Sequence, residues 1–80
     1  MSSDIQSVVF DKKYGWDNKK ALKWLLKHNI IPIKGEHIIN NRIRYRIKEP
    51  IYSSYITKKI SNGIDIIIGY TYNIYSYKNL

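Results

Sequence analysis

The residues best suited to chemistry form one alternating run, Arg42-Ile43-Arg44-Tyr45-Arg46-Ile47-Lys48. Because the side chains of an extended strand point alternately to its two faces, this run predicts a strand with three arginines and a lysine on one face and apolar residues on the other. Neighbouring cations would then stand about 6.6 Å apart. That separation suits successive phosphates of a nucleic-acid strand, and a guanidinium can bind each phosphate through two hydrogen bonds.

The same alternation also has a purely structural interpretation. Charged side chains on the outer face of a hairpin keep an exposed sheet soluble and discourage pairing at sheet edges. The chain has 11 lysines spread along its length, whereas all three of its arginines lie in this one run. This concentration of arginine favours phosphate binding over a face that is only solvated.

Two groups of lysines add to the basic character, one on the back of an expected helix and one at positions 58 and 59. Lysines on a helix face usually serve solubility, so the helix group alone indicates no function. The chain as a whole, however, carries 14 Lys and Arg against 6 Asp and Glu, a formal charge of +8. Basic clusters with few acids nearby are typical of nucleic-acid-binding proteins. The predicted nucleic-acid-binding residues are Arg42, Arg44, Arg46, Lys48, Lys19, Lys20, Lys23, Lys27, Lys58 and Lys59.

The helix that carries these lysines is predicted over residues 18–28, directly after a strand over residues 5–10. Asp17 is a good N-cap, and Trp16 and Ala21 stand at the two positions that a hydrophobic staple joins. The apolar side of the helix consists of Ala21, Leu22, Trp24, Leu25 and His28. Leu26 falls at the edge of the lysine sector, so we expect it to be partly exposed or covered by another element or chain.

The second half of the chain reads as hairpins. Asn40-Asn41 favours a two-residue turn between strands over residues 34–39 and 42–48, and residues 30–33 with Pro32 indicate an edge strand or a lead-in. Asn62-Gly63 predicts a second hairpin between residues 55–60 and 64–70. The latter stretch is the most hydrophobic, and we expect a central strand covered on both faces.

These elements predict an α+β fold, in which one N-terminal amphipathic helix packs on a small, mostly antiparallel sheet of four to five strands in the order β-α-β-β-β-β. Residues 1–70 would form a single compact basic domain. The tyrosine-rich tail over residues 71–80 would be a strand extension, a docking arm or disordered. Of the aromatic residues, Tyr70, Tyr72, Tyr75 and Tyr77 are candidates for stacking or partner docking, and Trp16, Trp24 and Tyr45 are expected in the core.

Other classes of function have little support in the sequence. The absence of cysteine excludes a disulfide framework, a thiolate zinc site and a cysteine nucleophile. Glu36 and His37 form an isolated pair, which leaves a small nuclease only as a minor alternative, and His28 is expected to end the helix. We expect no enzyme activity, no cofactor, no metal and no membrane partner. With neither a signal peptide nor an apolar span, an intracellular protein is expected.

Several stretches together resemble a small, largely uncharacterised α+β domain that recurs in proteins of giant DNA viruses and tailed phages. They are residues 5–10, Trp16 with residues 21–25 and His28, Arg44-Tyr45-Arg46 before Pro50, Tyr55 with residues 57–59, and Gly63-Ile64 with Ile68-Gly69. The resemblance implies a viral protein, in the host cytoplasm, a viral factory or the virion. It implies no particular activity.

The sequence therefore leads to two hypotheses. The first is a viral accessory protein that binds nucleic acid, DNA before RNA, through phosphate contacts and with little sequence preference. The alternative is a protein-interaction or self-assembly module of a virion or replication factory, which would form a homo-oligomer or bind an acidic viral protein.

Overall fold

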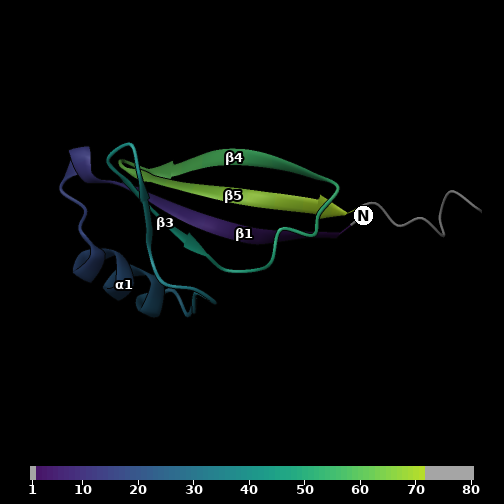
Figure 1. Ribbon diagram of the computed structural model, residues 1–80, viewed down its shortest axis with the longest axis horizontal. Coiled ribbons are helices and arrows are strands. Elements are labelled where there is room, and N and C mark those ends of the chain that lie inside the picture. The colour runs from purple at the N-terminus through teal and green to yellow at the C-terminus, as the bar shows by residue number, and fades with distance from the viewer. Residues whose placement is uncertain (1, 72–80) are drawn as a thin grey trace, which may run out of the picture.

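The computed structural model describes residues 2–71, in which one helix packs on a five-stranded antiparallel sheet (Figure 1). The strands lie side by side in the order β2-β3-β1-β5-β4, so β1 is the central strand. The predicted α+β fold is confirmed. The elements are β1 (Ser2–Asp11), the 3-10 turn η1 (Lys12–Tyr14), α1 (Asn18–Lys27), β2 (His37–Ile39), β3 (Arg42–Arg46), β4 (Ser54–Ser61) and β5 (Ile64–Thr71).

The helix α1 begins and ends as its sequence predicts. The Asp17 carboxylate accepts a hydrogen bond from the backbone N–H of Lys20 at 2.8 Å, which satisfies a donor of the first turn. At the other end His28 caps the helix and its ring stacks on Trp24 at 3.9 Å. Asn29 follows with φ 58°, the left-handed conformation that asparagine tolerates at a helix end.

Both predicted hairpin turns are present. Asn40 and Asn41 have φ values of 50° and 64°, the two positive values that a type I′ turn requires. Gly63 has φ 78° in the turn between β4 and β5. A Cβ atom at Gly63 would also come within 2.8 Å of Tyr14 and 2.9 Å of Trp16. Glycine is therefore required at this turn for two reasons, backbone conformation and space.

The hairpin formed by β2 and β3 is shorter than predicted. Its first strand starts at His37 rather than at residue 34, and its second ends at Arg46. The preceding segment forms a lead-in that makes one sheet-like hydrogen bond, from the Ile33 backbone N–H to the Arg46 carbonyl at 2.9 Å. Pro32 has no N–H to donate, which limits pairing in this segment.

The hydrophobic core lies between α1 and one face of the sheet. Phe10 is its centre, with ring centroids of Trp16, Trp24 and Tyr45 at 4.9, 5.7 and 5.9 Å. The Tyr45 hydroxyl donates a hydrogen bond to Asn18 Oδ1. The fully buried apolar side chains are Val8, Phe10, Ala21, Leu25, Ile43, Tyr45 and Ile64.

The expectation that β5 is covered on both faces is wrong. Only Ile64 and Gly69 of this strand are buried, and residues 65–68 are half-exposed. The reason is the extent of α1, whose ten residues lie near β1 and β3 and away from β4 (Figure 1). The other face of the sheet has no covering layer within residues 2–71.

Two further sequence predictions concern exposure and the chain end. Leu26 is 65% exposed on α1, so no other element of residues 2–71 covers it. The tail predictions for Tyr72, Tyr75 and Tyr77 lie outside the described residues, whereas Tyr70 and Thr71 belong to β5. Within the described part of the chain, no helix is long and apolar enough to cross a membrane.

Candidate nucleic-acid interface

The three arginines of β3 project from the side of the sheet opposite α1, as their alternation predicts. Ile43 and Tyr45 are buried against the helix, and the intervening positions therefore face the other way. On the neighbouring strand β1, Arg42 stands opposite Asp11, Arg44 opposite Val9 and Arg46 opposite Ser7. We call this uncovered side of the sheet the arginine face.

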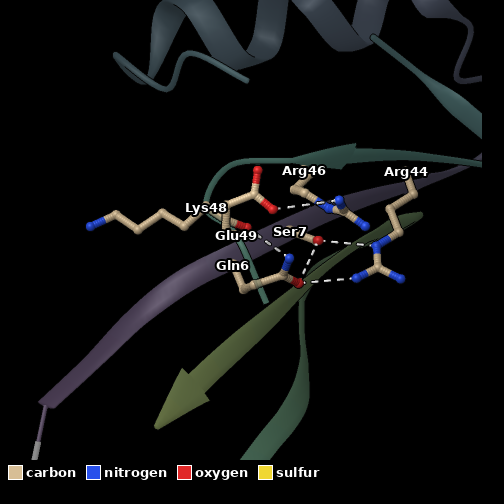
Figure 2. A network of polar contacts seen from close by, with 6 residues as sticks. All are labelled: Gln6, Ser7, Arg44, Arg46, Lys48 and Glu49. Atoms are coloured by element: carbon tan, nitrogen blue, oxygen red, sulfur yellow. Dashed lines mark hydrogen bonds and ion pairs between the residues drawn. The ribbon is translucent and has the colours of Figure 1, made fainter. Parts of the chain in front are cut away.

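Arg44 is held in place by a β-bulge in β1. The register shifts between Ile5 and Ser7, so Gln6 is an additional residue in the strand. Arg44 donates from Nε to Ser7 Oγ and from a terminal nitrogen to Gln6 Oε1, both at 3.0 Å (Figure 2). Gln6 and Ser7 are fully buried. The Ser7 hydroxyl donates a hydrogen bond to Gln6 Oε1 at 2.7 Å, and Gln6 Nε2 donates to the Lys48 carbonyl.

These partners fix the orientation of the Arg44 guanidinium without neutralising it. Gln6 and Ser7 are uncharged, and within residues 2–71 no carboxylate lies within 4.0 Å of Arg44. A cation with a defined orientation binds an anion with less loss of side-chain entropy than a mobile cation does. Arg44 is therefore the best-prepared anion-binding group on the arginine face.

The other cations of this strand are paired with carboxylates. Arg42 lies 4.0 Å from Asp11, Arg46 lies 3.8 Å from Glu49, and Lys48, just beyond β3, lies 3.5 Å from Asp4. The two arginine pairs are at the long end of ion-pair distances and partly exposed, and such pairs contribute only about 0–1 kcal/mol. A phosphate can replace these carboxylates at small cost.

Two hollows lie next to each other on the arginine face, and Arg44 and His37 line both. The smaller, about 200 Å³, is also lined by Lys34, Gly35 and Arg46. The larger, about 440 Å³, is lined in addition by Val9, Ile39, Asn40, Arg42 and Ile67. The arginines therefore border a shallow depression rather than a flat sheet, and its floor is partly apolar.

Sequence reasoning missed three residues of this interface, Gln6, Ser7 and Lys34. A bulge leaves no clear signal in the alternation of β1, so Gln6 and Ser7 read as ordinary strand residues. Lys34 reaches the hollow because the lead-in is bonded to β3 at Ile33, a tertiary contact. His37 also lies on the arginine face, opposite Arg44 in the register.

The structure places the lysines of α1 and Lys58 on the other side of the sheet from the arginines, and only Lys59 of this group on the arginine face. The lysines of α1 are all exposed on the helix, which packs on the opposite face of the sheet: Lys19, Lys20, Lys23 and Lys27. Lys58 and Lys59 are neighbours on β4 and so point to opposite faces. The register places Lys59 with Asp65 on the arginine face. The basic residues thus form two surfaces on opposite sides of the molecule.

Tyr52 and Tyr55 add aromatic surface at one end of the arginine face. The Tyr52 ring lies against Gly69, where a Cβ atom would come within 2.3 Å of it, and its hydroxyl donates to Asp4 at 2.9 Å. Tyr55 stands opposite Gly69 in the register, with its ring perpendicular to that of Tyr52 at 6.0 Å. Glycine at position 69 leaves the space that the Tyr52 side chain occupies.

Within residues 2–71, no three His, Cys, Asp or Glu side chains gather as the ligands of a metal ion would. Glu36 and His37 are both exposed, and His37 faces two arginines. The minor nuclease hypothesis gains no further residue from the fold.

Comparison with known proteins identifies no family for this chain. No family model matches the chain, and neither a curated protein nor a solved structure shows significant similarity to it. The resemblance to a viral domain therefore stays a prediction.

Proposed function

We propose that this protein binds nucleic acid through the phosphate backbone, with little sequence preference, and that the arginine face is the binding surface. The observation that carries the proposal is Arg44, whose guanidinium is oriented by buried neutral partners and has no carboxylate within 4.0 Å among residues 2–71. Arg42 and Arg46 stand on either side of it along β3, each about 6.6 Å away. Three cations at this spacing match three successive phosphates of one strand.

The proposal has a quantitative consequence for salt dependence. Each neutralised phosphate releases counterions, so the logarithm of affinity falls with the logarithm of salt concentration with a slope of about −0.7 per phosphate on single strands and −0.9 on duplexes. Three contacts predict a slope of roughly −2 to −3. Binding would then weaken strongly between low and physiological salt.

The lysines of α1 have a smaller role in this proposal. They are separated from the arginine face by the sheet and by the helix itself, whose diameter with side chains is about 10–12 Å. At physiological salt the screening length is about 8 Å, so these lysines act weakly on a ligand bound to the other face. A ligand on the arginine face is expected to lose little when they are neutralised.

The test is a titration of a fluorescently labelled oligonucleotide at about 50 and 200 mM salt with two paired variants. One variant, Arg42→Gln with Arg46→Gln, removes two charges from the arginine face. The matched control, Lys23→Gln with Lys27→Gln, removes two charges from the exposed back of α1. We expect the arginine pair to flatten the salt slope by roughly 1.5 and the lysine pair to leave it unchanged. Equal effects of the two pairs would show that only net charge matters and would reject the surface.

A second candidate function, self-association, is favoured by β4. All eight residues of this edge strand are exposed, with Ile56 and Ile60 at 48% and 44%, and no strand within residues 2–71 pairs with its outer side. Such an edge can pair with another chain, although Lys58 and Lys59 oppose that. Light scattering after size exclusion tests this candidate, which requires a stable dimer or larger assembly without nucleic acid.

A further inference from the structure

We propose that the nucleic acid bound by this protein is single-stranded, with its phosphates along the arginines of β3 and its bases on an apolar strip formed by Val9 and Ile67. The inference rests on the proposed function and specifies its substrate class. It follows from what lies beside the arginines rather than from the arginines themselves.

The apolar strip beside the arginines suits unpaired bases better than a duplex. Val9 and Ile67 are half-exposed on the arginine face and line the larger hollow together with Arg42 and Arg44. A duplex keeps the faces of its bases stacked inside and would present only phosphates and sugars to this floor. Unpaired bases expose their faces and gain from burial against apolar and aromatic side chains.

The strip lies at a distance from the arginines that suits a base whose phosphate they bind. Val9 stands directly opposite Arg44 on the next strand, about 4.8 Å away. Ile67 lies one strand further, opposite Ser7, which itself is opposite Arg46. The strip thus runs diagonally from β1 to β5, and its two residues lie one and two strand spacings from the row of arginines. This separation is comparable to that between the phosphate and the base of one nucleotide.

The arginines of β3 belong to a sheet that is too wide to enter a duplex groove. The major groove admits a helix or a two-stranded ribbon. Here β3 is paired on both sides, with β2 and with β1, so the arginines belong to a wide sheet. The tip of the β2–β3 hairpin is also tied to η1, because the Lys12 backbone N–H donates to the Asn41 carbonyl at 3.1 Å. A broad sheet face suits an extended single strand.

The end of the face beyond Arg46 supplies a stacking group. The Tyr52 ring lies on the sheet over Gly69, next to Ile67 along β5, and Tyr55 stands beside it. Base stacking on such rings does not depend on sequence, because every base has a π-face. The arrangement therefore agrees with binding that has little sequence preference.

The experiment compares a labelled single strand of roughly 16 nucleotides with the duplex of the same sequence at about 50 and 200 mM salt. We expect the single strand to bind at least about tenfold more tightly at the higher salt, where phosphate contacts are weakest. Val9→Thr and Ile67→Thr remove apolar contact while keeping β-branched side chains. Each should weaken single-strand binding about three- to tenfold without changing the salt slope.

Two controls keep the inference testable. Ile56→Thr makes the same substitution on the exposed strand β4 but on the opposite face, and it should leave binding unchanged. Thr57→Val enlarges the strip, because Thr57 stands opposite Ile67, and it should strengthen single-strand binding about twofold. Thermal unfolding of each variant identifies any that fails to fold. If Ile67→Thr does not fold, the binding of Thr57→Val tests the inference in its place.

The outcomes separate the two proposals. Duplex binding as tight as single-strand binding, with Val9→Thr and Ile67→Thr without effect, would overturn this inference and leave the phosphate-binding function standing. Duplex binding that is lost in the Lys23→Gln and Lys27→Gln variant would place the ligand on α1 instead. If neither form bound at low salt, the proposed function itself would fail.

Discussion

The two faces of the sheet are built from neighbouring residues but are held by different interactions. Val8 is fully buried beneath α1 among aromatic and aliphatic side chains, whereas Val9, the next residue, is half-exposed among arginines. On the helix face apolar burial stabilises the fold. On the arginine face, hydrogen bonds from Arg44 to Gln6 and Ser7 organise charge instead. Stability and the proposed binding can therefore be altered separately in this small domain.

The largest difference in stability between substitutions on the two faces is expected for Phe10→Ala. This substitution removes the ring at the centre of the core and should lower the free energy of unfolding by about 3–5 kcal/mol. Val9→Ala on the other face should cost no more than about 1 kcal/mol, since Val9 is half-exposed. Urea denaturation of both variants measures the difference. Similar costs would mean that the arginine face is packed as tightly as the core.

The free energy of unfolding should also depend on pH in alkaline solution, because Tyr45 is buried on the face of the sheet that α1 covers. Burial raises the pKa of Tyr45 to about 12, and the carboxylates of Glu36 and Asp17 add to the shift. Below pH 10, the ordinary pKa of tyrosine, the phenol is protonated in the folded and unfolded states, so this stabilisation is fully present. As the pH rises from 10 to 12 only the unfolded chain gives up its proton, and the stabilisation is lost.

The measurement compares the protein with Tyr45→Phe by urea denaturation. Relative to the Tyr45→Phe variant, the unchanged protein should lose about 2 kcal/mol of unfolding free energy between about pH 9 and about pH 11.5. Other tyrosines and the lysines titrate equally in both proteins and cancel. A difference that does not vary with pH would show that the phenol is accessible to solvent.

Arg44→Ala should be the one arginine substitution that affects the fold. It leaves the buried Gln6 and Ser7 without their charged donor, and the loss should cost about 1–2 kcal/mol of unfolding free energy. Arg42→Ala is the matched control, because its ion pair with Asp11 is long and exposed and should cost less than about 0.5 kcal/mol. Equal costs for the two would contradict a special role for the bulge.

The smallest effect is expected for Glu49→Gln, and it should appear in binding alone. In the proposed complex Glu49 would compete with a phosphate for Arg46, from which it lies 3.8 Å away. Its neutralisation should strengthen oligonucleotide binding about twofold at low salt, with a change in stability of less than about 0.5 kcal/mol. Weaker binding in the titration would show that Glu49 orients Arg46 rather than competing for it.

Much of the fold was predictable because it depends on short-range patterns. The N-cap Asp17, the Asn40-Asn41 turn and the turn at Gly63 involve interactions within a few residues. The alternation of residues 42–46 depends only on strand geometry. The prediction for β5 failed for the opposite reason, because how much of a strand is covered depends on the length and position of α1.

Local sequence patterns predict the helix, the approximate positions of the strands, both hairpin turns and the shared face of the arginines. Tertiary packing sets which side of the sheet α1 covers, and therefore that the lysines of α1 and the arginines lie on opposite surfaces. It also decided that Gln6 holds Arg44 across 38 residues of chain, and that Lys34 borders the same hollow. The physical reason is that strand pairing and helix docking join distant segments, and no local pattern encodes which distant partner each segment meets.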